Sequence, residues 1–272
     1  MSEDLEQLKR QVSNVLDFAD SFRAKVVQFV LLLINLFACF LCVLSTYVTD
    51  TYSLDILHNI DIALAVVFII EYALRMWSSR ERMAFCFSFY SIVDLLSIIP
   101  TFLGSFGMGY LRFLRVFRIL RFSRYLEDGF FFFGELSELH LQFLKVVFSV
   151  ITIVFIFSGF IHFLESAHNP KIHTWGEACY FIVITMSTVG YGDVTPITDF
   201  GKWATVLMIF CSAILVPWQA GKLIRMAMIM ESGFIMSTCE SCGLKRHDHD
   251  ASHCKSCGHV IYQEYDPLDE LV

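Results

Sequence analysis

Charged residues are scarce in this chain: Asp, Glu, Lys and Arg together make up 17% of its 272 residues, against about 25% in an average soluble domain. Hydrophobic residues reach 56%, and 28 residues are phenylalanine. A soluble fold has to keep its surface polar, so this composition excludes a soluble domain and predicts a membrane protein. Only five residues are proline, which excludes a collagen-like or proline-rich chain, and disorder is excluded over most of the length.

An excess of positive charge is lacking as well. The formal net charge is −7, so no general basic field attracts nucleic acid, and we expect no nucleic-acid partner. The amino terminus is polar and acidic and shows no small-residue cleavage site behind a short apolar segment, which argues against a cleaved signal peptide. Residues 1–22 have the pattern of an amphipathic helix, because leucine and valine recur on one side.

Long hydrophobic runs, in contrast, are abundant. A transmembrane helix needs about 20 mostly apolar residues, and six runs are candidates. They cover about Val26–Val48, Ile56–Trp77, Ala84–Leu103, Tyr110–Tyr125, Leu141–Leu164 and Trp203–Ile224. A seventh run, Trp175–Ser187, is too short to cross and is followed by glycine and proline, so it predicts a re-entrant helix.

The predicted fold class is therefore an all-α membrane protein with six transmembrane helices and one re-entrant helix. Lysine and arginine gather before the first run, between the second and the third, and after the last. By the positive-inside rule both termini are cytoplasmic, which an even number of crossings also requires. We expect an integral protein of the cell or plasma membrane that contacts membrane lipids.

The fourth run carries an arginine at every third position, a repeat that we call the arginine ladder: Arg112, Arg115, Arg118, Arg121 and Arg124. Charge inside a membrane is expensive, so the ladder predicts a functional element. A basic helix lying on an anionic membrane surface is the alternative. That alternative fits poorly, because a three-residue step spirals around an α-helix, whereas a 3₁₀ helix would align the side chains in one row.

Acidic residues in the neighbouring runs can pair with the ladder. Asp61 and Glu71 lie about 15 Å apart along the second run at 1.5 Å per residue, and Asp94 lies in the third run. Phe68 is one turn from Glu71 and could form an apolar plug between the two acidic levels. Asp61 taken alone also fits a helix-end residue near the interface, an interpretation that suits Glu71 less well.

A glycine-containing motif follows the re-entrant run: Thr188, Val189, Gly190, Tyr191, Gly192 and Asp193. Successive backbone carbonyls that face one axis can replace the water around a potassium ion, and glycine at alternate positions permits the positive φ that this requires. Thr188 adds a hydroxyl, and Tyr191 would brace this filter against the re-entrant helix. An ordinary glycine-rich turn would not follow a half-length apolar helix. The motif predicts bound potassium ions and, because only a fourfold ring closes, a homotetramer.

Three segments resemble the voltage-sensor domain of the voltage-gated potassium channel family: FIIEYALRMW (68–77), SIVDLLSIIP (91–100) and LRFLRVFRILRFSR (111–124). The resemblance implies that Phe68, Glu71 and Asp94 form a charge-transfer centre. It also implies that Asp61 is an outer counter-charge and that the ladder arginines are gating charges.

The chain departs from this family pattern at two places. Gly109 stands where many relatives have a further, outermost gating charge. Tyr180 and Phe181 occupy positions of the re-entrant helix at which relatives usually have tryptophan, so filter stability and slow inactivation are expected to differ. The segment SGFIHFLES (158–166) resembles most closely the large-conductance calcium-activated branch of the family.

The last hydrophobic run contains three candidates for a hinge. Ser212 stands where the family usually has a hinge glycine. The bend would then lie at Pro217, which cannot donate the i−4 hydrogen bond of a helix, or at Gly221. A tolerated proline kink without a gating role is the alternative.

Four of the nine cysteines form two CxxCG pairs near the carboxyl end: Cys239, Cys242, Cys254 and Cys257. Two such knuckles suit tetrahedral Zn²⁺ bound by four thiolates, with each glycine permitting the tight turn. A reducing cytoplasm disfavours disulfides, and a redox dithiol pair or an iron site is the alternative. We interpret His247, His249 and His253 as solvated loop residues, although one could replace a cysteine. The sequence predicts a small zinc ribbon whose folding depends on the metal.

The predicted organisation has five parts: an amino-terminal amphipathic helix (1–22), a four-helix voltage sensor (23–125), an interfacial linker (126–140), a pore domain (141–232) and a zinc-ribbon-like tail (233–272). The predicted function is a voltage-gated, potassium-selective channel that opens on depolarisation, and not an enzyme. Channel control by zinc or redox through the tail, and a non-conducting voltage-sensing regulatory subunit, are the alternatives. A transporter is disfavoured because no inverted repeats are evident.

Overall fold

The computed structural model describes residues 9, 22–79, 82–103, 109–127, 130–131, 134–135, 137–231, 237–245, 247–248 and 251–261. The helix predicted for residues 1–22 lies almost entirely outside these ranges. The chain divides into two compact units, Met1–Pro217 and Trp218–Val272, which are described separately. The all-α fold class is confirmed: apart from one pair of two-residue strands and an isolated bridge, the regular elements of the described residues are helices.

Four of the described helices are long and apolar enough to cross a membrane, and they correspond to the first, second, fifth and sixth predicted crossings. They are α2 (Phe22–Leu44), α3 (Thr51–Ser78), α7 (Glu138–Glu165) and α9 (Asp199–Glu231). Capping fixes where two of them begin. The Asp50 carboxylate accepts a hydrogen bond from the Ser53 N–H at the start of α3, and the Ser137 hydroxyl accepts one from the His140 N–H at the start of α7.

The third predicted crossing differs from the expected single run. It consists of α4 (Arg82–Cys86) and α5 (Phe89–Leu103), with a break at residues 87–88. The physical reason is a new helix start: the Ser88 hydroxyl accepts a hydrogen bond from the Ser91 N–H at 3.3 Å, as an N-terminal cap does.

The fourth predicted crossing is mainly a 3₁₀ helix, η2 (Gly109–Arg121), which continues into the short α6 (Phe122–Glu127). Thirteen residues extend about 26 Å at the 3₁₀ rise of about 2.0 Å, against about 20 Å in an α-helix. Because three residues make one turn, Arg115, Arg118 and Arg121 follow one another along a single side of η2.

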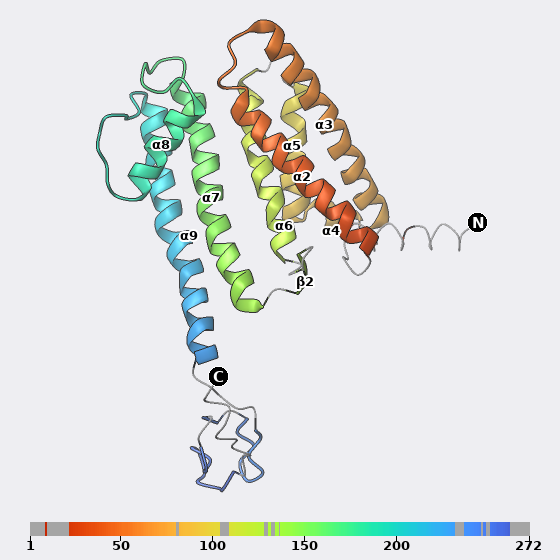
Figure 1. The fold of residues 1–272 in the computed structure, drawn as a ribbon, viewed down its shortest axis with the longest axis vertical. Helices are drawn as coiled ribbons and strands as arrows, with labels where there is room; N and C mark the ends of the chain where they lie inside the picture. Colours follow the sequence, from red (N-terminus) through yellow and green to blue (C-terminus); the bar gives the residue numbers. More distant parts are fainter. Residues whose placement is uncertain are drawn as a thin grey trace, which may run out of the picture. The chain divides into compact units, whose positions relative to one another are not determined.

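The helices α2, α3, α5 and η2 pack against one another in the first unit, and Figure 1 shows them as the bundle coloured from red to yellow-green. Its apolar core includes Ala38, Phe68 and Ile98, one residue from each of α2, α3 and α5. Several polar side chains are buried in the same bundle. The bundle therefore holds the ladder among charged as well as apolar neighbours.

A second group of helices in this unit is formed by α7, α8 (Trp175–Met186) and the first part of α9. The short α8 begins with a capping box in which Thr174 and Glu177 each bond the other's backbone. Ile161, Ile182 and Met208, from the three helices in turn, are fully buried in the shared core. The helix α9 is continuous through Pro217, one of the three hinge candidates.

The ladder helix lies directly against α7. The Phe113 ring centre is 4.9 Å from that of Phe163 and 5.5 Å from that of Phe160. Gly159 permits the approach of Val116, because a Cβ at Gly159 would collide with the Val116 side chain. The linker between the two helices contains β1 (Phe130–Phe131), paired antiparallel with β2 (Gly134–Glu135).

The second unit contains the end of α9 and the cysteine-rich tail. The Lys222 Nζ lies 3.7 Å from the centre of the Trp218 ring. In the tail, Gly243 and Gly258 have φ of 75° and 73°, each directly after the second cysteine of a pair. The structure therefore has the glycine turns that the knuckle pattern predicts.

Candidate functional site

Arg118 is almost fully buried, with 1% of its surface exposed. Its guanidinium pairs with the Asp61 carboxylate, donates from Nη2 to the Thr101 hydroxyl at 2.9 Å, and donates from Nε to the Ser97 carbonyl at 3.4 Å. Arg115 binds the other oxygen of Asp61 at 3.1 Å. Asp61 is thus a buried counter-charge for two arginines, a geometry that does not suit an exposed helix-end residue.

A second acidic level holds the next two arginines. Arg121 donates from Nε to Asp94 Oδ1 at 2.8 Å, and Arg124 donates from Nη2 to Asp94 Oδ2 at 2.9 Å. Glu71 Oε2 lies 4.0 Å from Nη1 of Arg121, and Glu71 Oε1 lies 3.9 Å from Nη1 of Arg124. The same carboxylate lies 3.0 Å from Arg75, four residues further along α3.

Phe68 separates these two levels along α3, about two turns after Asp61 and one turn before Glu71. Its ring is 1% exposed, and the ring centre lies 4.0 Å from the guanidinium carbon of Arg121. The structure therefore brings four ladder arginines together with all four predicted partners. The side chain of Arg112 lies outside the described side chains, although its backbone belongs to η2.

Three polar members of this network were not identified from the sequence: Arg75, Thr101 and Asn35. Arg75 had a signal, because its i,i+4 spacing from Glu71 favours an ion pair on a helix. Thr101 and Asn35 are uncharged residues in apolar runs, and only the packing of the helices shows what they contact.

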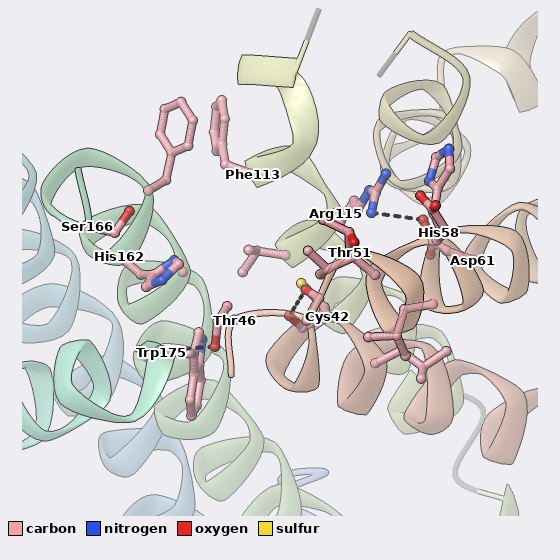
Figure 2. Close-up of a pocket in the computed structure, with 18 residues that line it drawn as sticks. Cys42, Thr46, Thr51, His58, Asp61, Phe113, Arg115, His162, Ser166 and Trp175 are labelled. Atoms are coloured by element: carbon pink, nitrogen blue, oxygen red, sulfur yellow. Dashed lines mark hydrogen bonds and ion pairs between the residues drawn. The ribbon is translucent and has the colours of Figure 1, made fainter. Parts of the chain in front are cut away.

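A cavity of about 530 Å³ opens beside the Asp61 level, between the ladder bundle and the α7–α8 part of the unit. Figure 2 shows Arg115 joined to Asp61 on one side of this cavity, with His162 and Trp175 on the other. In contrast, the space beside Phe68 and Arg121 amounts to only about 10 Å³. The layer around Phe68 is therefore densely packed.

The filter motif has an alternating backbone. The φ angles of Thr188, Gly190 and Gly192 are 62°, 58° and 77°. Alternation of left-handed and right-handed residues places successive N–H groups on one side of the chain and leaves the carbonyls for the other. The N–H groups of Val189 and Gly190 both lie 3.1 Å from the Ile184 carbonyl in the last turn of α8, which anchors the inner end of the motif.

The outer end of the motif is held by side chains from elsewhere. The Tyr180 hydroxyl in α8 donates to Asp193 Oδ2 at 2.9 Å, and the Lys171 ammonium donates to the Asp193 carbonyl at 2.6 Å. Tyr191 is 72% exposed in the single chain, so it does not form the predicted brace against the re-entrant helix of its own chain. Tyr180 provides that brace instead.

Glu165, the last residue of α7, was missed by sequence reasoning and is fully buried. Its carboxylate accepts hydrogen bonds from the Ile197 N–H (2.9 Å), the Thr198 N–H and hydroxyl (3.0 and 2.5 Å) and the Asn169 amide (2.9 Å). Asn169 also donates to the Thr195 carbonyl at 2.9 Å. This cluster ties α7 to the segment that connects the filter motif with α9, and its one signal in the sequence was an acid at the end of an apolar run.

The three hinge candidates lie on a continuous helix. The Ser212 hydroxyl donates to the Ile209 carbonyl at 2.9 Å, within its own turn. Pro217 lies inside α9, and a Cβ added to Gly221 would meet no atom within 4 Å. None of the three therefore ends the helix.

The four cysteines of the tail form a group able to bind a metal ion. Their sulfur atoms all lie within 4.8 Å of one another, and the Cys239–Cys257 and Cys242–Cys254 pairs are 3.6 Å apart. Zinc–sulfur bonds of about 2.3 Å in a tetrahedron place sulfur atoms about 3.8 Å apart, so the donor set fits this ion.

The interpretation of His247 as a solvated loop residue is wrong. Its side chain is fully buried, and Nδ1 lies 2.9 Å from the Ser237 carbonyl. The neighbouring His247 side chain is the main cause that lowers the pKa of the Cys254 thiol to about 5, which favours the thiolate that metals bind. His253 is exposed, as predicted, and His249 lies outside the described residues.

Known proteins similar to this chain include three channel proteins. A hyperpolarization-activated voltage-gated potassium channel of Methanocaldococcus jannaschii is 30% identical over 205 residues, which are 72% of this chain and 94% of that protein. The human voltage-gated potassium channel regulatory subunit KCNF1 is 29% identical over 178 residues, 59% of this chain and 36% of that protein. The calcium-activated potassium channel slowpoke of Drosophila melanogaster is 26% identical over 225 residues, 78% of this chain. The chain spans only 18% of the length of slowpoke.

The family described as "Ion transport protein" matches residues 24–217, which include the ladder bundle, the filter motif and most of α9. This match covers well over half of the chain. It identifies a membrane transport protein and not an enzyme. The chain belongs to the ion transport protein family.

Proposed function

We propose that this chain is one subunit of a voltage-gated, potassium-selective channel. The observation that carries the proposal is the left-handed backbone at every second residue of the filter motif, at Thr188, Gly190 and Gly192. This backbone lies directly behind a half-length apolar helix. Four copies around one axis would offer rings of carbonyl oxygens that replace the water around potassium, so the proposal includes a homotetramer with potassium ions in the filter.

Voltage sensitivity is proposed from the ladder and its counter-charges. Moving one charge through 100 mV changes its energy by about 2.3 kcal/mol, so three arginines per chain in a tetramer supply about 28 kcal/mol. Arg121 lies at the Phe68 ring, and two further arginines lie on the Asp61 side of it. We assign this arrangement to the depolarised membrane, with Phe68, Glu71 and Asp94 as the charge-transfer centre.

The proposed organisation follows the ranges expected from the sequence: sensor 23–125, linker 126–140, pore domain 141–232 and tail 233–272. Both termini are proposed to be cytoplasmic, because lysine and arginine favour that side. Of the hinge candidates, Pro217 and Gly221 are retained as sites at which α9 could bend during opening.

A non-conducting regulatory subunit is the second candidate function. It is favoured by one observation, the similarity to a human protein named as a regulatory subunit. The positive φ at every second residue of the filter motif favours a conducting channel instead.

Voltage-clamp recording of the full chain in a cell membrane tests the proposal, with potassium and sodium gradients set in opposite directions and voltage stepped both ways. We expect a steeply voltage-dependent current that reverses near the potassium potential. Gly190→Ala should abolish this current and leave charge movement intact, because a left-handed φ costs a residue with a Cβ about 1–2 kcal/mol.

Two results would contradict this proposal. Reversal near the sodium potential would refute the filter assignment. Charge movement without current in the unmodified chain would favour the regulatory subunit. The direction of voltage that opens the channel is decided in the same recording, since one relative is named for activation by hyperpolarization.

Zinc in the tail gives a separate prediction. The purified chain should contain about one zinc ion per chain, because four thiolates saturate a structural site. Cys254→Ser should remove most of it, whereas Cys211→Ser, in α9 and outside the group, should not. Metal analysis of the purified variants decides this. Iron in place of zinc, or equal metal content in both variants, would contradict the zinc ribbon.

A further inference from the structure

Asn35 is a buried polar residue in the apolar helix α2, with 2% of its surface exposed. Its Nδ2 donates to the backbone carbonyl of Arg118 in η2 at 3.4 Å. Its Oδ1 is also buried, and it has no hydrogen-bond partner among the described residues. A buried acceptor without a partner is costly, so its presence calls for a reason.

Asn35 is also one of the residues around a small cavity in the ladder bundle. Asn35 lines the cavity of about 10 Å³ that Phe68, Glu71, Asp94 and Arg121 also line. The Nη2 of Arg121 is likewise buried without a hydrogen-bond partner among the described residues, although its Nε binds Asp94. Two residues that line the same small space beside Phe68 therefore each carry a buried polar atom without a hydrogen-bond partner among the described residues, one an acceptor and the other a donor. At this size the cavity is at the lower limit for a single water molecule.

We propose that Asn35 belongs to the charge-transfer site, and that its Oδ1 accepts a hydrogen bond from each ladder guanidinium while that group passes Phe68. A guanidinium carries five N–H donors and has no acceptor of its own. Between the Asp94 level and the Asp61 level it passes an apolar ring and gives up carboxylate partners. A neutral amide oxygen at this depth stabilises the passing cation without binding it as tightly as a carboxylate would.

The donor side of the same amide is matched to the repeat of the ladder. In a 3₁₀ helix a shift by three residues, about 6 Å, places an equivalent carbonyl where that of Arg118 lies now. The Asn35 Nδ2 can therefore bond the backbone again after each step. Loss of Asn35 consequently changes the rate of movement more than the balance between its end states.

The inference rests on the voltage sensing proposed above, and it is tested by displacement currents of the full chain in a cell membrane without permeant ions. Asn35→Leu removes the acceptor at nearly constant size, and should slow charge movement in both directions about tenfold, or about 1.4 kcal/mol, with total charge unchanged. Asn35→Gln keeps a neutral amide with both its donor and its acceptor, and should move charge at nearly the original rate. Cys39→Ala, one turn away and also buried, is the packing control and should leave the rate unchanged.

Several outcomes would overturn the role of Asn35. Unchanged or faster movement in Asn35→Leu would do so, as would equal slowing in Cys39→Ala, because packing would then be responsible. If Asn35→Leu moves no charge at all, Asn35→Gln decides, and slow movement in that variant refutes the acceptor. The absence of displacement current in the unmodified chain would be a different failure, since it overturns the voltage sensing itself.

Discussion

Replacement of Glu165 by alanine is expected to lower the free energy of unfolding by more than about 3 kcal/mol and to abolish stable conduction. Its carboxylate receives four hydrogen bonds in a fully buried position, and each buried donor left without a partner costs about 1–3 kcal/mol. Three of the four donors, from Ile197 and Thr198, lie on the segment between the filter motif and α9, so we expect the damage to reach the filter motif. In a tetramer the loss would occur four times.

Two variants sharpen this experiment. Glu165→Gln keeps the shape, but its amide N–H₂ has to face backbone N–H groups, so we expect an intermediate stability and a current that declines faster during a long depolarisation. Glu138→Ala, at the exposed start of the same helix, should change stability by less than about 0.5 kcal/mol. Thermal unfolding of the purified chain and prolonged recordings provide the two measurements. A Glu165→Gln protein that behaves like the unmodified chain would show that the carboxylate cluster does not support the filter.

Neutralisation of Arg118 in Arg118→Gln is expected to reduce the charge moved by about one elementary charge per chain. In a tetramer that removes about 9 kcal/mol of electrical work per 100 mV, so the dependence of opening on voltage becomes clearly shallower. Arg118 is chosen because it is buried and paired with Asp61, next to the Phe68 layer that it would cross. The measurement is the charge moved per channel, obtained from displacement currents and channel counts.

A conservative variant separates charge from geometry. Arg118→Lys keeps the charge but loses the planar fork that contacts Asp61 and Thr101 together. The moved charge should therefore stay the same, while the voltage of half-movement shifts. Arg225→Gln, an exposed arginine near the end of α9, should alter neither quantity. An unchanged moved charge in Arg118→Gln would remove Arg118 from the gating charges.

The sequence predicts the helices well because a transmembrane helix is surrounded by apolar lipid and must itself be apolar over about 20 residues. Runs such as Leu141–Leu164 are long and almost uncharged, so their length alone predicts a crossing. The break at residues 87–88 was missed because it depends on the hydroxyl of Ser88, and a single serine in an apolar run carries no clear signal. The choice between α-helix and 3₁₀ helix over Gly109–Arg121 was open as well, since it depends on whether the arginines find partners on one side.

In the candidate sites, the charged residues could be identified from the sequence, whereas the uncharged polar residues could not. Asp61, Glu71 and Asp94 could be named because a carboxylate in an apolar run is expensive and demands a partner. Asn35 and Thr101 carry no charge, so they demand a partner less strongly, and only the packing of the helices shows what they contact. His247 was misjudged for the same reason: whether a histidine between two knuckles is solvated depends on how the loop folds over the sulfur atoms.

The contacts between the ladder helix and α7 bear on how a defect in one chain affects an assembly of mutant and unmodified chains. The Phe113–Phe163 stack and the Val116–Gly159 contact join the ladder helix to α7 of the same polypeptide. In the proposed tetramer they would couple each sensor to the pore quarter of its own chain. A mutant chain in a mixed tetramer would then disturb its own quarter first, and its neighbours only through the shared axis. We therefore expect the functional defect of a mixed tetramer to increase stepwise with the number of mutant chains. One mutant chain should not produce the full defect.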